Sequence, residues 1–261
     1  MLSFSQLNEA QILLFALILL RMSAFVVSAA LFNSTAISAP LKILFSVVLA
    51  MVLFAPVGTN EALVRVNESQ SQLLLLAGRE VFLGLVLGFV TRMFFFAVSM
   101  AGEIVSLSMG LGQAQMFNPI MGSMSNAMEQ FYSVIATLLF LALDGHHMML
   151  MGLAESFSAS PVALLDFNIG TLAEVVTKTQ SFFVIGIKIA APVMISMIVI
   201  QVGIALLSRV VPQINVIVTS ASITILAGFL IMFISLPLLV MQMTGLLDFS
   251  MGEFFKFLKA I

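Results

Sequence analysis

Two adjacent histidines, His146 and His147, follow Asp144 and Gly145, and they are the only 2 histidines in the 261 residues. Imidazole nitrogens and carboxylates bind transition metals and can act as acid and base in catalysis. However, neighbouring side chains on a helix point in different directions, and no HExxH motif or third ligand at i,i+4 spacing is present. No GxSxG motif accompanies them either. The pattern therefore indicates a helix-end turn capped by Asp144, with no metal site and no enzymatic activity expected.

Several ionisable residues interrupt long apolar runs elsewhere in the chain. Each costs several kcal/mol in an apolar medium unless it is paired or hydrated, so such residues are expected to face the interior of a helix bundle. Lys188 needs a carboxylate, which Glu103, Glu129 or Asp144 could supply. Structural ion pairing is one hypothesis for the group and a proton relay is the other. The expected buried-charge and packing residues are Glu80, Gly84, Gly88, Arg92, Glu103, Glu129, Asp144 and Lys188, with Arg21 and Arg79 as further charges in apolar runs.

The stretch between Glu103 and Glu129 contains 25 uncharged residues, including three Gly, two Gln, two Asn, one Pro and five Met. Irregular backbone at membrane depth persists only where protein surrounds it or it lines a wet cavity. Methionine is flexible and polarizable, so it can close around variable chains and reopen. A gating role is therefore predicted for this segment. The expected pore residues are Gly110, Gly112, Gln113, Gln115, Met116, Phe117, Asn118, Pro119, Met121, Gly122 and Met124.

The composition places the chain in a membrane. It is 61% hydrophobic and 8% charged, with a mean hydropathy of +1.20 and a net charge of -2, whereas soluble domains are about 25% charged. Ten scattered Lys and Arg residues form no basic face for nucleic acid. The absence of Cys excludes disulfides and thiolate metal sites. With 24 Phe but one Tyr and no Trp, the usual aromatic belts at the headgroups are missing. Either much of the surface meets other protein chains, or Phe replaces Trp and Tyr by chance.

Apolar length predicts an all-α integral membrane protein, because a span needs about 20 residues. The expected helices cover residues 10–32, 40–56, 73–108, 128–152, 181–208 and 213–236. The whole chain, 1–261, is expected to be one polytopic subunit. Residues 1–152 would hold helices 1–4 with a loop at 106–127, followed by a polar connection at 153–180, a helical hairpin at 181–242 and an amphipathic tail at 243–261.

The helix predicted at 73–108 carries a distinctive face. At 100° per residue, Arg92 and Glu103 lie within about 20° of each other around the helix axis. Gly84 and Gly88 form a GxxxG step, which allows another backbone to approach closely. This face is predicted to pack against helices, either of the same chain or of partners.

Four motifs in the same order resemble a known family. They are Gly78-Arg79-Glu80 leading to Gly84 and Gly88, Gly110 to Pro119, Leu143-Asp144-Gly145-His146 followed by Glu155-Ser156-Phe157, and Arg209 to Val216. Together with length and hydropathy, they make the chain similar end to end to the FliR family of flagellar type III secretion export-gate subunits. Two details differ from the family pattern: Asn118 stands where Asp is common, and residues 217–221 lack the usual aromatic and Gly-x-Pro step.

The resemblance implies a noncatalytic component of the flagellar export gate in the bacterial inner membrane at the basal body. FliR-like subunits assemble with FliP and FliQ, are contacted by FlhB, and pass unfolded flagellar proteins as cargo. The resemblance also implies that the loop at 110–125 plugs the pore. It places the last turn, with Arg209, Pro212, Gln213 and Asn215, toward the cytoplasm, and it implies no cofactor.

Two other hypotheses compete with the gate. An ion- or proton-coupled small-molecule transporter would act through Arg92, Glu103, Glu129 and Lys188. An intramembrane enzyme would use Asp144, His146 and His147 and would lose activity on His146→Ala. The transporter predicts flux by the purified single subunit, whereas the gate predicts a mixed assembly.

Overall fold

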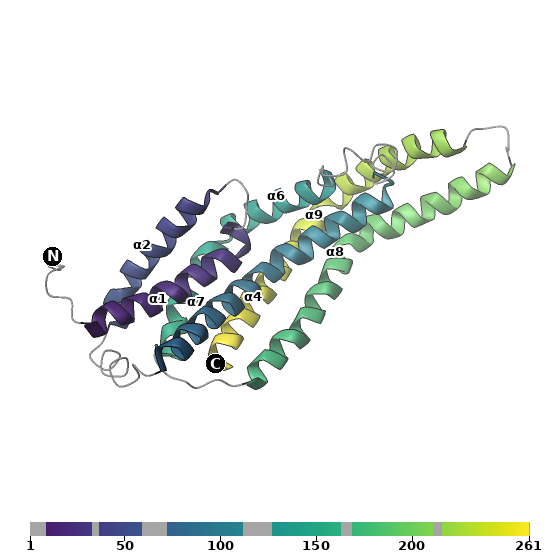
Figure 1. Ribbon diagram of the computed structural model, residues 1–261. Coiled ribbons are helices and arrows are strands. Elements are labelled where there is room, and N and C mark those ends of the chain that lie inside the picture. Colours follow the sequence, from purple (N-terminus) through teal and green to yellow (C-terminus); the bar gives the residue numbers. More distant parts are fainter. Residues whose placement is uncertain are drawn as a thin grey trace. The chain divides into compact units, whose positions relative to one another are not determined.

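The structure is a computed structural model that describes residues 9–32, 37–58, 72–111, 127–162, 169–210 and 216–260. The elements within these ranges are all helical (Figure 1). They are α1 (Glu9–Ser28), η2 (Ala30–Phe32), α2 (Ala39–Val57), α4 (Leu73–Ser108), α6 (Ala127–Ala142), α7 (Gly145–Ala159), α8 (Ile169–Val210) and α9 (Val216–Ala260). The predicted all-α class is confirmed. A helix forms the hydrogen bonds of its backbone groups within one segment, as the hydrocarbon core of a membrane requires.

Five of the described helices are long and apolar enough to cross a membrane: α1, α2, α4, and segments of α8 and α9. The pair α6 and α7 passes the same test if the two are counted as one broken span, which gives up to six. The predicted helix at 73–108 matches α4 residue for residue. Pro40 lies in the first turn of α2, after the N-cap Ser38, where a missing N–H costs nothing.

Three predicted boundaries differ from the structure. The helix expected at 128–152 is broken at Asp144, whose backbone is left-handed with φ 55°. Helix α8 begins at Ile169, inside the stretch expected to be a polar connection. Helix α9 continues through Pro237 to Ala260, so the tail is not a separate segment. A proline removes one backbone hydrogen bond, and tertiary packing on both sides can hold the helix together.

Packing of the last turns explains why α9 continues to Ala260. Leu247, Met251, Phe254 and Leu258 are buried, at spacings of three and four residues that place them on one helix face. Phe254 lies against Gly152 of α7, where an added Cβ would come within 3.0 Å of the Phe254 ring. The apolar face of the predicted amphipathic tail is therefore buried within the protein.

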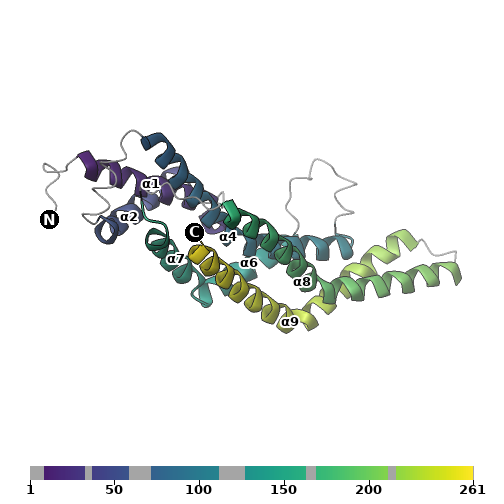
Figure 2. The same cartoon turned by 90° about the horizontal axis from the view of Figure 1, so that it is seen from below.

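The chain divides into two compact units. Unit 1 contains Met1–Met93, Asp144–Lys178 and Ser250–Ile261, and unit 2 contains Phe94–Leu143 and Thr179–Phe249. Within unit 2, the long stretches of α8 and α9 run antiparallel, as both Figure 1 and Figure 2 show. These are the helices of the predicted hairpin, and the turn at 211–215 lies outside the described residues.

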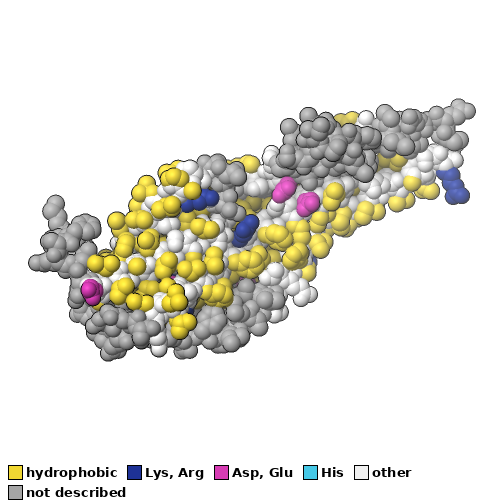
Figure 3. All heavy atoms as spheres, viewed as in Figure 1, with side chains coloured by type: hydrophobic (Ala, Val, Ile, Leu, Met, Phe, Trp, Pro, Cys, Tyr) yellow, Lys and Arg dark blue, Asp and Glu magenta, His cyan; other side chains and the backbone are white. Residues whose placement is uncertain are grey.

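The helices differ in how much of their apolar surface the chain itself covers. The membrane-length windows are 50% buried in α1 and 61% in α4, but 11% in α2, 28% in α8 and 22% in α9. Hydrophobic side chains accordingly occupy much of the described surface in Figure 3. A single chain thus leaves three helices largely uncovered.

Candidate functional site

Unit 1 contains a buried ion-pair cluster that joins three helices. Arg21 of α1 donates from Nε to Oε2 of Glu80 on α4 at 2.6 Å, and both side chains are fully buried. Arg79 donates from a terminal nitrogen to the other oxygen, Oε1, of Glu80 at 3.2 Å. The Glu80 carboxylate therefore compensates two guanidinium groups, as expected for charges inside an apolar bundle.

The guanidinium of Arg21 also closes the carboxyl end of α7. It donates to the backbone oxygen of Ser156 at 3.0 Å and to that of Ser160 at 2.9 Å. It lies 4.2 Å from the centroid of the Phe157 ring. The last carbonyls of a helix lack partners within the helix, and a cation there also interacts favourably with the helix dipole. Arg21 thus fixes the end of α7 as well as the position of Glu80.

The predicted GxxxG step positions this cluster. A Cβ on Gly84 would collide with the backbone oxygen of Arg21 and would lie 2.8 Å from the Cβ of Ala24. A Cβ on Gly88 would collide with the hydroxyl of Ser28 and lie 2.9 Å from the Ala29 backbone nitrogen. Only glycine permits this distance between α1 and α4. The step packs against another helix of the same unit.

Four of the charges expected inside the bundle lie on the surface of the single chain. They are Arg92 and Glu103 on α4, Asp144 before α7 and Lys188 on α8. No described residue forms an ion pair with Lys188, so the carboxylate partner expected for it is not found within the described ranges. At 100° per residue, Arg92 and Glu103 share one stripe of α4 with the exposed side chains of Phe89 and Phe96.

The carboxylate of Glu129, at the start of α6, accepts a hydrogen bond from α4. Ser99 donates its hydroxyl proton to Oε1 of Glu129. The two helices meet closely here, because a Cβ on Gly102 would lie 2.8 Å from the Cα of Glu129. Both helices flank the uncharged segment, because α4 ends at Ser108 and α6 begins at Ala127. The structure thus packs the start of α6 against α4 at Ser99 and Gly102, within unit 2.

Residues of two further helices contact the end of α4. Gly110 has φ 78°, a left-handed conformation that glycine adopts without strain and that commonly ends helices. The N–H of Leu111 bonds to the oxygen of Ser106 at 3.1 Å. The side-chain amide of Gln201 on α8 donates to the oxygen of Ser108 at 2.9 Å. Met109 is buried and lies directly over Gly228 of α9.

Most of the predicted pore residues lie outside the described ranges, as does most of the expected cytoplasmic turn. Gly110 is described, and so is Arg209, which is exposed in the last turn of α8. The predicted residues that lie outside are Gly112, Gln113, Gln115, Met116, Phe117, Asn118, Pro119, Met121, Gly122, Met124, Pro212, Gln213 and Asn215.

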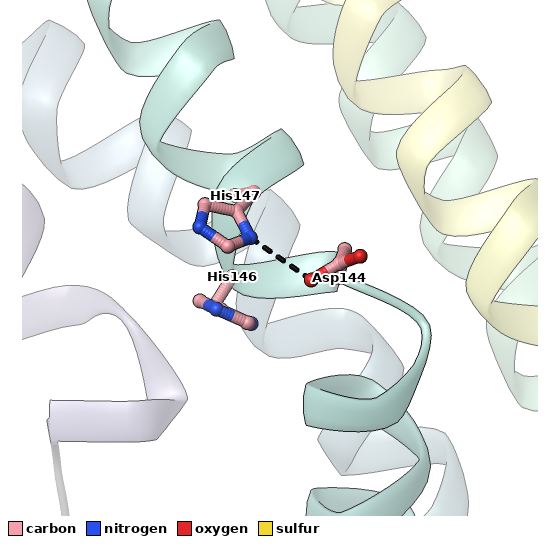
Figure 4. Close-up of side chains that lie close together, drawn as sticks. All are labelled: Asp144, His146 and His147. Carbon is pink, nitrogen blue, oxygen red and sulfur yellow. Dashed lines mark hydrogen bonds and ion pairs between the residues drawn. The ribbon is translucent and has the colours of Figure 1, made fainter.

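The structure brings the side chains of Asp144, His146 and His147 together at the start of α7 (Figure 4). Nδ1 of His147 lies 2.9 Å from Oδ1 of Asp144. The two imidazole centroids are 4.1 Å apart, so the expectation that the two histidines point apart is wrong. In the first turn of a helix no preceding turn restricts the side-chain torsions, and both rings can swing to one side. Asp144 stands at the N-cap position but makes no side-chain capping bond.

Comparison with known proteins identifies the family. Residues 12–250 match the family model described as "Bacterial export proteins, family 1". The chain belongs to this family of bacterial export proteins. Its relatives include the flagellar biosynthetic protein FliR of Aquifex aeolicus, 34% identical over 187 residues, which covers 71% of this chain and 70% of the relative.

Two further relatives extend the similarity over most of the chain. The FliR of Bacillus subtilis is 29% identical over 228 residues, covering 86% of each protein. The FliR of Caulobacter vibrioides is 29% identical over 238 residues, covering 90% of this chain and 92% of the relative. The predicted FliR-family resemblance is confirmed. This member of the export family is therefore a membrane protein of flagellar biosynthesis and protein export.

Sequence reasoning missed several residues of these contacts. Ser156 and Ser160 accept from Arg21 through backbone oxygens, which no side-chain pattern reveals. Gln201 could have been found, because it is an isolated amide within the long apolar run of α8. Gly102 and Gly228 belong to no GxxxG step, so nothing in their spacing distinguished them.

Proposed function

We propose that this protein is a subunit of the flagellar type III secretion export gate. It forms part of the pore through which unfolded flagellar proteins cross the bacterial inner membrane, at the flagellar basal body, and it acts without catalysis. The family match and the names of the relatives support the export role. The partners proposed from the family resemblance are FliP, FliQ and FlhB.

The observation that carries the proposal is the exposure of charges on membrane-length helices. Arg92, Glu103 and Lys188 face outward on α4 and α8. A charge at the centre of a bilayer costs about 2.5–3.5 kcal/mol on insertion scales, so three charges facing lipid would be a large penalty. Neighbouring protein subunits with complementary charges remove this cost. They would also cover the apolar surface that α2, α8 and α9 leave exposed.

The same placement argues against the transporter hypothesis. A proton or ion path through a single subunit would require Arg92, Glu103 and Lys188 to line an interior route, whereas all three side chains are exposed. Glu129 is partly buried, and its Oε1 accepts a hydrogen bond from Ser99. These residues therefore support contacts with other chains better than a relay within this one.

Native mass spectrometry of the gently extracted complex tests the assembly. The chain is co-expressed with FliP, FliQ and FlhB, and we expect masses of a mixed assembly. Lys188→Asp reverses a charge on the exposed face of α8 and should lower the assembled fraction. Glu9→Gln, at the exposed start of α1, serves as the control and should not. A monomer or homodimer of the unmodified chain would refute the gate proposal.

We further propose that residues 110–125 plug the pore at rest. The segment has no charges and contains the glycines, amides and methionines that suit a reversible closure. The contacts of Gln201, Met109 and Gly102 hold its two ends. A plug of this kind needs fixed ends and a deformable middle, because the ends define where it returns after cargo has passed.

Deleting Gly110 to Gly122 should raise ion leakage through the assembled complex. A second variant, in which residues 112–122 are replaced by Gly and Ser at equal length, keeps the reach of the loop and removes its side chains. Leakage is measured in cells by membrane depolarisation, and the assembly of each variant is verified by native mass spectrometry. Unchanged conductance in both assembled variants would exclude the plug.

A further inference from the structure

The start of α7 gathers both imidazoles of the chain beside one carboxylate. The ligand atoms of Asp144, His146 and His147 lie within 4.8 Å of one another, and these are the only 2 histidines in the sequence. Ligand atoms in a tetrahedral zinc site lie about 2.0–2.2 Å from the metal, so small side-chain rotations bring these three into range. Figure 4 shows the His147 ring joined to the Asp144 carboxylate by a hydrogen bond, with His146 next to them at the start of the helix.

The nitrogen atoms of the cluster are not all used by the protein. Among the described residues, Nδ1 of His146 is buried and has no hydrogen-bond partner. A buried polar atom without a partner costs about 1–3 kcal/mol, which a bound metal ion would recover. Nδ1 of His147 lies 2.9 Å from Oδ1 of Asp144, and a metal ion bound by both atoms would take the place of the proton between them.

The charges beside the two imidazoles, whose centroids are 4.1 Å apart, act on a bound cation in two opposite ways. The helix dipole opposes a cation at the start of a helix by about 0.3–1 kcal/mol. The carboxylate of Asp144 lies next to that start and offsets this term through its opposite charge.

We propose that Asp144, His146 and His147 form a binding site for a divalent transition metal ion such as Zn²⁺ or Co²⁺. Nitrogen ligands with one carboxylate suit these ions, and they do not suit Mg²⁺ or Ca²⁺, which require oxygen. Three protein ligands leave the remaining positions to water. All three ligands lie within four consecutive residues, so the ion fixes the backbone at the start of α7. This proposal does not depend on the export function.

Metal titration of the purified full-length chain in detergent tests the site. The protein is prepared with a tag that contains no histidine, because a histidine tag would bind the ions itself. Co²⁺ is added first, since its visible spectrum reports nitrogen coordination, and Zn²⁺ is then added to displace it. We expect one ion per chain. The sequence contains no Cys and no other His. Its only imidazole ligands are therefore in this cluster, and it has no thiolate ligands.

Substitution of each proposed ligand tests whether the ion binds at this cluster. His146→Ala and His147→Ala should each weaken Co²⁺ binding by on the order of 10-fold to 100-fold, as loss of a ligand or its support does. Asp144→Asn should weaken it as well. Glu155→Gln removes an exposed carboxylate elsewhere on α7 and should leave the affinity unchanged, with circular dichroism verifying that all variants fold. The proposal is overturned if the unmodified chain shows no saturable binding, or if the double variant of both histidines binds as tightly as the unmodified chain.

Discussion

Breaking the ion pair between Arg21 and Glu80 should be among the most destabilising changes in unit 1. We propose a cycle of Arg21→Met, Glu80→Gln and the double variant. Glu80→Gln keeps the shape of the side chain and removes the carboxylate that faces both Arg21 and Arg79. Arg21→Met fills part of the same volume and removes the donors to the end of α7.

The structure sets the magnitude. Arg21 donates to Glu80 and to two backbone oxygens, with distances of 2.6–3.0 Å, and hydrogen bonds to charged groups contribute about 1.5–3 kcal/mol each. Its guanidinium also lies over the Phe157 ring, a contact of about 2 kcal/mol when desolvated. These terms are not additive, and desolvation of the ions opposes them. Removing one partner of a buried pair typically costs about 3–5 kcal/mol, because an uncompensated charge stays buried.

The free energy of unfolding in detergent is measured by SDS titration followed by circular dichroism, because the chain has no Trp and one Tyr and fluorescence would report little. Each single variant should lose about 3–5 kcal/mol. The double variant should lose about 1–3 kcal/mol less than the two singles combined. Arg92→Met is the control for loss of an arginine, because Arg92 is exposed, and it should stay within about 0.5 kcal/mol of the unmodified chain. Additive losses, or single losses below about 1 kcal/mol, would refute the coupling.

Close contact between α1 and α4 makes a second set of predictions. Gly88→Ala should destabilise the chain by about 1–3 kcal/mol, as overpacking does, because the new methyl would meet Ser28 and the backbone of Ala29. Gly84→Ala should destabilise it by a similar amount through the backbone of Arg21. Gly78→Ala on the same helix has nothing within 4 Å of its Cβ and should instead stabilise by about 0.5–1 kcal/mol. The same SDS titration compares the three, and equal effects at all three positions would contradict the packing.

Much of the fold was predictable because it depends on local properties of the chain. Hydrocarbon forces apolar segments into helices, and the bounds of α4 and the start of α2 followed from length and from Pro40. Two features of the helices were not predictable from local properties. The break at Asp144 depends on a left-handed residue, and the continuation of α9 past Pro237 depends on the burial of its last turns.

The residues of the candidate site divide in the same way. The sequence alone determined which charges lie in apolar runs, that Gly84 and Gly88 permit a close helix, and that the chain belongs with the bacterial export proteins. Only the tertiary structure decided that Glu80 is buried while Glu103 and Lys188 are exposed. It also decided that Arg21 reaches the oxygen of Ser156, 135 residues away in the sequence. Helical periodicity relates residues three or four positions apart, whereas ion pairs between helices depend on which faces pack together, and no local pattern encodes that choice.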